Sequence, residues 1–401
     1  MFAQIHTLTG YSSVLLNRDD TGMAKRAKYG NAVRTRTSSQ FAKSKLRKVS
    51  ADVEYSVANL GDLAVRSRET FKREIALKLI EEGLEKAPVV YATVAIMDAV
   101  FKLSEGAKKD RKEKEEKIAK GEADIIILLE RGELNILSRS EIEFMKGLVR
   151  QFATDATTEQ AVKAANDYLA NREFKANLVL AGKSMSLDMA MFGRMVTGDV
   201  LSGADAAVNV AHAITTHAQA TEVDFFTAVD DLVTGIGDKG GAHLGETEIT
   251  SPLLYGNYVL DMRQLFENLK GVDNRTDVAA RLSRNLVHLV AEYVVGAKKG
   301  STAPYSSADL VLVEIGTRQP RTLAEAFRNK VGPTLGEAVS AMESYLRGKD
   351  RMYGGHLNER LVASTVDLSP VFGAQMCLPD LADAVAGRVA TAGAAFSAQE
   401  G

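Results

Sequence analysis

The strand-like segments of this chain fall into two groups, and the long helical stretch 52–180 separates them. The N-terminal segment "FAQIHTLTG" places Ala3, Ile5 and Thr7 on one side before a glycine, which predicts a strand. Strand-like sequence returns only within 186–316. A sheet built from both groups must pair strands that are distant in the chain, and this requirement constrains the fold more than any other feature.

The later segments supply the remaining strands and a second helix. An earlier helix is expected from Ser38 or Ser39, which are favourable N-cap residues. The order strand, helix, strand, strand, helix, strand predicts an α+β fold with a ferredoxin-like (RRM-like) core. The later strands are predicted at 186–195, 207–215, 255–265 and 308–316, and the second helix at 276–294.

Two long insertions interrupt this core. Ser138 and Glu141 form a capping-box pattern within the first, helical insertion, and 108–120 has almost no apolar residue to line a core. The second insertion, 216–251, is rich in glycine without strong periodicity, so it is either disordered or functional. Helices are predicted at 66–86, 95–120 and 140–172, at 322–331 with a Thr322–Glu325 capping box, and after 380.

Composition places the protein in a reducing compartment. The single cysteine, Cys377, excludes an intrachain disulfide framework. The N-terminal sequence lacks the basic and apolar regions of a signal peptide, and no apolar run approaches the roughly 20 residues of a membrane span. We therefore expect a cytoplasmic protein.

The charge of this chain is strongly uneven, because its net charge is only −2. Residues 18–48 carry ten cations against two acids, Asp19 and Asp20, which gives a local charge of +8. This stretch is expected to run from a loop at 17–22 through an extended segment to the predicted helix. Lys43 and Arg47 share one face of that helix, and the helix start offers free N–H groups to a phosphate. The pattern favours nucleic-acid binding over a merely solvated surface.

Several motifs, taken in order, resemble one family. They are "LNRDD", "GNAVRTRTSSQFAKSKLR", "MFGRM", "VAHAITTH", "VDFFTAVDDL" and "GAHLGETEITS". The chain resembles the backbone subunit of the type I-E CRISPR Cascade complex, which belongs to the repeat-associated RNA-binding (RAMP) superfamily. The resemblance covers the first fifty residues and nearly everything from 185 to about 330, and it is weak in the helical insertion and the tail.

The resemblance implies a palm, helical fingers and a thumb. The palm would comprise 1–51, 181–211 and 252–401, the fingers 52–180 and the thumb, a loop or hairpin, 212–251. Copies of such a subunit stack head to tail along the guide RNA (crRNA), and each thumb kinks the RNA. The implied partners are guide RNA, the target DNA strand that pairs with it, neighbouring copies and other Cascade subunits, in antiviral defence. The protein would grip phosphates and leave base edges free.

The resemblance also implies which residues contact RNA. Met195 would wedge between bases near the kink, although a methionine alone is usually core filling. Lys298 and Lys299 match a second basic segment, although a lysine pair alone is typical of a solvated turn. The other expected RNA contacts are Asn17, Arg18, Lys25, Arg36, Ser38, Ser39, Gln40 and Lys43, with Arg34 and Arg47 as additions. The expected thumb contacts are His217, Phe225, Phe226 and Val229.

Other functions remain open from the residues alone. Asp19 with Asp20, or Asp230 with Asp231, could hold a metal for RNA cleavage, which would make the protein an endoribonuclease. The resemblance implies instead a protein that is not an enzyme and has no cofactor. His212 and His217 fall on opposite sides of a strand, so no metal site is expected there. A protein scaffold without nucleic acid would leave the basic stretch without an anionic partner.

The lysine-rich segment 102–120 has two interpretations. It carries eight cations against five acids, which is compatible with a plain exposed helix. It could also be a secondary path for the incoming target DNA duplex.

Overall fold

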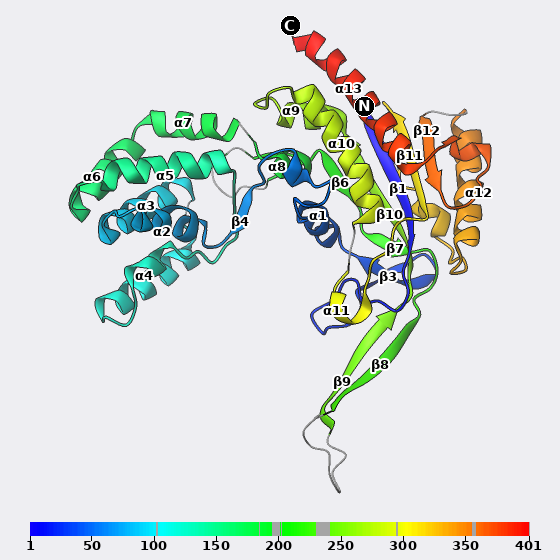
Figure 1. Cartoon of the computed structure of the whole chain (residues 1–401), viewed down its shortest axis with the longest axis horizontal. Coiled ribbons are helices and arrows are strands. Elements are labelled where there is room, and N and C mark those ends of the chain that lie inside the picture. Colours follow the sequence, from blue (N-terminus) through cyan, green and yellow to red (C-terminus); the bar gives the residue numbers. More distant parts are fainter. Residues whose placement is uncertain are drawn as a thin grey trace. The chain divides into compact units, whose positions relative to one another are not determined.

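The chain divides into two compact units in a computed structural model that describes residues 1–101, 103–183, 185–194, 201, 203–229, 241–293, 296–354 and 358–400. The first unit comprises residues 1–59, 208–263 and 276–401, and the second comprises 60–207 and 264–275. Both contain helices, and the first is built around a large sheet (Figure 1). The predicted α+β class is confirmed.

The sheet of the first unit brings the two ends of the chain together. Its strand order is β13-β12-β11-β1-β10-β7-β3-β2, and β6 pairs with β10 beside this path. Every pair is antiparallel except β12 with β13. The strands are β1 Phe2–Gly10, β2 Arg26–Tyr29, β3 Ala32–Thr37, β6 Val208–Val210, β7 Ala213–Thr215, β10 Leu253–Asp261, β11 Leu310–Gly316, β12 Glu359–Ser364 and β13 Ala374–Gln375.

Strand β1 is central because it pairs along both edges. It runs from Phe2 opposite Asp261 to Gly10 opposite Leu253 on β10, and it pairs with β11 on its other side. Its residues from Ala3 to Leu8 are all buried, which is typical of a strand covered on both faces. The predicted strands at the N-terminus and at 308–316 are therefore confirmed. The predicted strand 255–265 is confirmed only as far as Asp261, because helix α9 begins at Met262, and the segment 207–215 forms two short strands, β6 and β7.

Helices and short turns cover this sheet. Leu8, Tyr255, Leu312 and Phe327 pack in one core with Met342 of α12. Burial of such apolar side chains provides most of the stabilisation of a core. The helices and helical turns of this unit are α1 Ser39–Arg47, η1 Val57–Asn59, α10 Arg275–Glu292, α11 Lys299–Thr302, η4 Ala324–Phe327, α12 Leu335–Tyr353, η5 Pro370–Phe372 and α13 Leu378–Glu400, and α9 Met262–Asn268 crosses the unit boundary.

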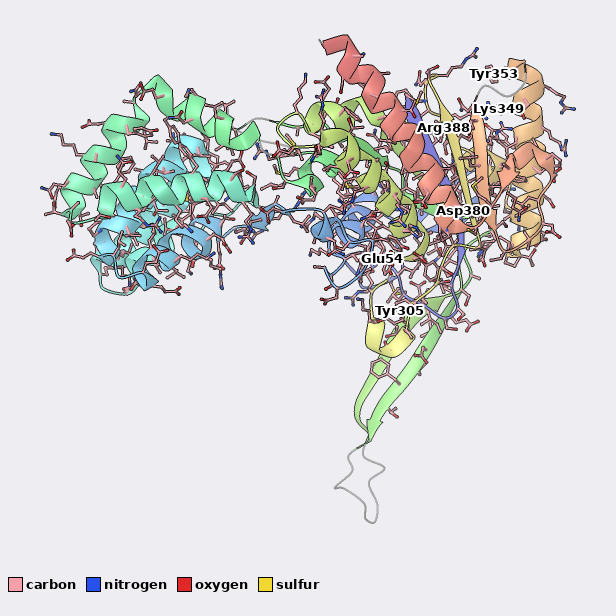
Figure 2. All side chains as sticks on the ribbon, turned by 45° about the horizontal axis from the view of Figure 1, so that its top comes forward. Glu54, Tyr305, Lys349, Tyr353, Asp380 and Arg388 are labelled. Atoms are coloured by element: carbon pink, nitrogen blue, oxygen red, sulfur yellow. The ribbon has the colours of Figure 1, made fainter. Side chains whose placement is uncertain are left out.

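The C-terminal helix α13 is attached through ion pairs. Arg388, labelled in Figure 2, pairs with Glu359 of β12 through two hydrogen bonds of 2.8 and 2.6 Å. Arg284 of α10 donates to Asp383 at 2.6 Å. The predicted helix over 276–294 and the predicted helical tail are therefore confirmed, and the tail is tied to both a strand and a helix.

The second unit is mostly helical and has its own core. The Ser138–Glu141 capping box is confirmed at the start of α5, and Glu141 also binds Arg194 with both oxygens, at 2.8 and 2.7 Å. Both side chains of this pair are 1% exposed. The elements are β4 Val65–Ser67, η2 Phe71–Ala76, α2 Leu77–Glu81, α3 Lys86–Val100, α4 Glu105–Ala119, η3 Ile125–Leu129, β5 Asn135–Leu137, α5 Arg139–Ala153, α6 Thr158–Leu169, α7 Arg172–Lys183 and α8 Leu187–Phe192.

Several predicted elements are wrong in the helical insertion. The predicted helix 95–120 breaks between α3 and α4, and 140–172 breaks between α5 and α6. The predicted strand 186–195 contains the helix α8 instead. Within this helix the buried Asp188 carboxylate accepts the Ala64 N–H at 2.8 Å, a long-range contact that a strand pattern does not reveal. The range 181–211, which the resemblance implied for the palm, divides between the two units after residue 207.

The expected Thr322–Glu325 capping box is absent. The turn η4 has no side-chain cap, because Thr322 accepts from the adjacent Ala324 N–H at 3.1 Å. The Glu325 carboxylate instead accepts hydrogen bonds from Tyr29 and Arg328. Residues with a capping-box spacing therefore serve tertiary contacts here.

The glycine-rich insertion contains a two-stranded hairpin of β8 Thr221–Val229 and β9 Gly241–Thr250. Figure 1 shows it extending away from the sheet of its unit. A side chain at Gly245 would meet the Phe226 ring, since an added Cβ would lie 2.3 Å from it. A larger residue at position 245 would therefore displace the exposed Phe226 ring from this position. No helix within the described residues is long and apolar enough to cross a membrane.

Candidate nucleic-acid interface

The loop before β2 is fastened to the start of α1. Asn17 Oδ1 accepts the Ser38 N–H at 3.0 Å, and the Asn17 carbonyl accepts the Lys25 N–H at 2.8 Å. Arg18, which is exposed, lies beside Ala24 in a small antiparallel bridge. Asn17 thus places the loop cations next to the helix start.

Asp19 is a structural residue of this loop. Its Oδ1 accepts hydrogen bonds from the Thr21 N–H, the Thr21 hydroxyl and the Met23 N–H, at 3.0, 2.8 and 3.0 Å. The Thr21 hydroxyl bond is the main cause that lowers the pKa of Asp19. An aspartate engaged in this way shapes a turn.

The start of α1 is arranged to receive an anion. The Ser38 hydroxyl caps the helix by accepting the Phe41 N–H at 3.2 Å, and the first turn contains no acidic residue. Ser39 and Gln40 lie in this first turn, and Gln40 is exposed. The first N–H groups of a helix have no intrahelical acceptor and carry partial positive charge.

Arg36 and Arg34 of β3 have different roles. Arg36 is partly exposed and donates to His212 Nδ1 at 3.0 Å. Arg34 was predicted as an RNA contact, but its side chain is fully buried. Its guanidinium donates to the carbonyls of Thr215, Thr216 and Phe327, at 3.2, 2.6 and 2.7 Å. Arg34 therefore braces the sheet from within and does not face solvent.

His212 lies within the electrostatic field of the basic stretch. Burial is the main cause that lowers its pKa, and the charges of Arg36 and Lys25 lower it further. Lys25 is also close to Arg36 along the backbone, because its carbonyl accepts the Arg36 N–H at 2.8 Å. Lys25 and Arg36 are thus brought together at one place.

Lys45 also belongs to this basic surface, although it was not among the expected RNA contacts. Burial lowers its pKa, and the nearby charges of Lys299 and Lys48 lower it further. Its ammonium lies 5.3 Å from the centre of the Phe41 ring. Lys45 and Phe41 of α1 line the same pocket as Ala297, so α1 and the second basic segment lie close together. The spacing of Lys45 along the predicted helix did not reveal this neighbour.

A surface pocket joins three of the basic segments of the first unit. It is bounded by the loop at 17–22, by α1 and by the residue before Lys298. Its lining contains two cations from separate segments, Arg18 and Lys45, together with two acids, Asp19 and Asp20. The pocket is lined by Leu16, Asn17, Arg18, Asp19, Asp20, Gly22, Phe41, Lys45 and Ala297.

Lys43 and Arg47 lie on α1 as predicted, and both are partly exposed. Lys299 is exposed, whereas Lys298 donates to the Thr247 hydroxyl of β9. Lys299 therefore faces solvent, whereas Lys298 is engaged with the hairpin.

The hairpin exposes large apolar side chains. Val223, Phe225 and Phe226 are 57%, 61% and 45% exposed. His217 is a different case, since it is buried: its Nδ1 donates to the Ala218 carbonyl at 2.8 Å, and its Nε2 accepts the Leu253 N–H at 3.1 Å. His217 therefore fixes the chain before the hairpin and is not a surface contact.

Some predicted residues lie outside the described part of the chain. Met195, Asp230 and Asp231 are not described, and neither is the side chain of Val229. Among the described residues, no group of three His, Cys, Asp or Glu side chains is placed to hold a metal ion.

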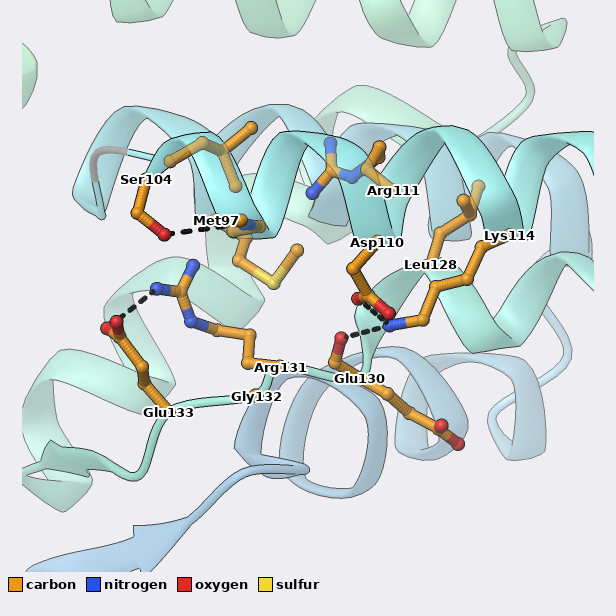
Figure 3. A pocket seen from close by; sticks show the side chains of 13 residues that line it. Met97, Ser104, Asp110, Arg111, Lys114, Leu128, Glu130, Arg131, Gly132 and Glu133 are labelled. Atoms are coloured by element: carbon orange, nitrogen blue, oxygen red, sulfur yellow. Dashed lines mark hydrogen bonds and ion pairs between the residues drawn. The ribbon is translucent and has the colours of Figure 1, made fainter.

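A further pocket lies in the second unit, beside the lysine-rich helix α4 (Figure 3). Its cations already have acidic or carbonyl partners. Arg111 binds both oxygens of Asp98, at 2.6 and 2.8 Å, and Lys114 pairs with Asp110 and donates to the Glu130 carbonyl. No residue of α4 is buried, which agrees with a plain exposed helix. A secondary path for the target DNA duplex along this segment stays a prediction.

Comparison with known proteins identifies the family of this chain. The family model described as CT1975-like protein matches residues 3–384. The chain belongs to the CT1975-like protein family. No curated protein matches it.

Two solved structures share its fold. A chain of a "CRISPR RNA-guided surveillance complex, pre-nicking" is 24% identical with a TM-score of 0.75, and the match covers 97% of this chain and 100% of that one. A chain of a "CRISPR RNA-guided surveillance complex" is 18% identical with a TM-score of 0.56, covering 97% and 99%. Matches over nearly complete chains show that this CT1975-like protein has the same fold as those chains.

Proposed function

We propose that this CT1975-like protein is the backbone subunit of a type I-E Cascade complex and binds guide RNA without cleaving it. The observation that carries this proposal is the pocket at which the loop 17–22, α1 and the segment before Lys298 meet. Supporting it are the family, the titles of the two solved relatives and the motifs that resemble type I-E backbone subunits.

The sheet supports a ferredoxin-like palm of the RAMP type. The four strands β11-β1-β10-β7 are neighbours in that order, and α10 connects β10 to β11 across β1. With α1 between β1 and β7, these elements follow the strand and helix order of a ferredoxin-like core. The helical unit would correspond to the fingers and the hairpin to the thumb.

The proposed mechanism is binding. Lys25, Arg36, Lys43, Lys45 and Lys299 would neutralise phosphates, which gives affinity without reading sequence. The exposed Phe225 and Phe226 would pack on kinked RNA and on the next copy. Guide bases would remain available to target DNA. We propose no catalytic role for Asp19, because three donors already occupy its Oδ1.

A salt titration of RNA binding tests the proposal. Arg36→Glu and Lys43→Glu should weaken binding to single-stranded RNA of two unrelated sequences equally. Each should also lower the slope of affinity against salt by roughly 1 per lost phosphate contact. Arg351→Glu, which changes an exposed cation on α12, is the matched control and should change neither quantity.

The outcome also decides among the alternatives. A sequence-dependent loss would contradict a phosphate grip. Cleavage of the RNA that disappears in Asp19→Ala would favour an endoribonuclease. Absence of RNA binding at low salt would favour a protein scaffold.

A further inference from the structure

Glu248 of β9 ties the hairpin to the basic loop. Its Oε2 accepts the Ala24 N–H at 2.6 Å, and its Oε1 accepts from the Arg26 guanidinium at 2.9 Å. The Glu248 side chain is only 3% exposed. Both contacts are charge-assisted, and such hydrogen bonds are about twice as strong as neutral ones.

The opposite face of β9 is tied to the second basic segment. Successive residues of a strand point to opposite faces, so Thr247 points away from Glu248. The Thr247 hydroxyl accepts a hydrogen bond from the Lys298 ammonium. At the base of the strand, Thr250 and Val14 exchange two backbone hydrogen bonds of 2.8 Å. The two basic segments therefore hold β9 from both of its faces.

We infer that Glu248 is a positioning residue that couples RNA binding by the basic loop and α1 to the orientation of the hairpin. The inference rests on the proposed function, since the phosphates bound there would belong to RNA. Glu248 acts through Ala24 and Arg26 and does not contact RNA. It fixes the loop that carries Arg18 and Lys25 in one body with β9, so that ordering either one orders the other.

Whether removal of the Glu248 carboxylate lowers or raises RNA affinity distinguishes a positioning role from a purely electrostatic one. A carboxylate near phosphate-binding cations opposes the binding of phosphate. If Glu248 contributed only its charge, its removal would raise the affinity for RNA. If Glu248 positions the loop and the hairpin, its removal lowers that affinity, because the loop cations lose their fixed geometry.

Glu246 offers a matched control on the same strand. It lies two residues from Glu248 and therefore on the same face of β9, and it is exposed. Its cross-strand partner is Phe225, whereas that of Glu248 is Val223. Glu246→Ala removes the same charge at nearly the same place without breaking the contacts to Ala24 and Arg26.

The experiment uses the full chain with single-stranded RNA as the probe. Hydrogen exchange of peptides within 221–229 and 241–250 is measured with and without RNA, together with RNA affinity. In the unmodified protein, RNA should slow exchange in the hairpin. Glu248→Ala should abolish that RNA-dependent protection and lower RNA affinity by about tenfold. Glu246→Ala should keep the protection and bind RNA equally or slightly more tightly.

A second variant keeps the test informative if Glu248→Ala folds poorly. Glu248→Gln retains an oxygen that can accept the Ala24 N–H but loses the charge that pairs with Arg26. It should therefore show partial protection and intermediate affinity. Unchanged exchange of β1 and β10 peptides establishes that the sheet is intact in each variant.

Two results would overturn the inference. One is a Glu248→Ala protein that behaves like Glu246→Ala. The other is tighter RNA binding in Glu248→Ala with the hairpin still protected. If the unmodified protein binds no RNA, the proposed function and the coupling both fail. Faster hairpin exchange in RNA-free Glu248→Ala, but not in Glu246→Ala, would still support the structural tie itself.

Discussion

The guanidinium of Arg36 donates a hydrogen bond to Nδ1 of His212 over 3.0 Å. An Nδ1 that accepts this bond carries no proton, so the contact favours the neutral imidazole. Burial and the cations Arg36 and Lys25 lower the pKa of His212 below its ordinary value of 6.5. The pKa of His212 therefore responds to the charges that surround its imidazole ring.

We predict that RNA binding raises the pKa of His212. A bound phosphate would offset the charges of Arg36 and Lys25 and so favour the imidazolium. Because protons are then taken up on binding, RNA affinity should increase as the pH falls from about 7 through the pKa of His212 in the free protein. Magnetic resonance titration of His212 with and without RNA measures the shift. A pKa that falls or stays constant would refute this prediction, and His212→Gln should remove this contribution to the pH dependence.

Arg34 and Arg36 should separate stability from RNA binding. Arg34→Leu removes the buried guanidinium that donates to the carbonyls of Thr215, Thr216 and Phe327, so we expect it to lower the free energy of unfolding by about 3 kcal/mol. Arg36→Leu should change that free energy by less than about 1 kcal/mol and weaken RNA binding instead. Urea unfolding and RNA affinity measured on both variants check this. Equal effects of Arg34→Leu and Arg36→Leu on the free energy of unfolding would contradict the assignment of Arg34 to stability and of Arg36 to RNA binding.

The two arginines also show what the sequence could and could not predict. The extended segment and the helix after Ser38 follow from local residue types, and both were predicted. Residues 34 and 36 lie on the same side of a strand, so their pattern predicts equal exposure. What distinguishes them is the set of carbonyls from Thr215, Thr216 and Phe327, which come from distant parts of the chain.

Contacts between distant parts of the chain, which local patterns do not reveal, also account for the other predictions that were wrong or incomplete. α8 was predicted as a strand because Leu187, Met189 and Met191 alternate with other residues. All six residues of α8 are buried, and Asp188 contacts Ala64 far away in sequence, so an alternating pattern could not identify the element. Lys45 and Glu248 were omitted from the predicted site because their partners, Lys299 and Arg26, are far away in sequence.

We predict that the buried pair of Glu141 and Arg194 stabilises the helical unit. Glu141→Gln leaves the Arg194 guanidinium buried without its counter-charge, and we expect a loss of about 3 kcal/mol in the free energy of unfolding. Glu143→Gln on the same helix removes an ion pair with Lys146 in which the carboxylate is 60% exposed, so it should cost less than about 1 kcal/mol. Chemical unfolding measures the free energy of unfolding of both variants. Similar losses of stability in Glu141→Gln and Glu143→Gln would contradict the prediction.

The exposed hairpin should matter for assembly more than for the binding of one copy. Phe225→Ser removes an exposed ring, so the fold should be retained, and the RNA affinity of a single copy should fall less than in Arg36→Glu because the phosphate contacts remain. Ordered stacking on long RNA should be lost, because the ring would no longer pack on the next copy. Electron microscopy of the assemblies measures this, with Val366→Ser, at an exposed apolar residue outside the hairpin, as the control. Regular assemblies formed by Phe225→Ser would exclude the thumb role.

Whether the purified protein carries RNA is the measurement that tests the central claim most directly. The chain has no tryptophan, so its ultraviolet spectrum is unusually sensitive to bound nucleic acid. The account predicts RNA that co-purifies, that ribonuclease degrades and that high salt removes, after which the stripped protein binds added single-stranded RNA regardless of sequence. A protein that purifies without nucleic acid and does not bind single-stranded RNA at low salt would contradict it.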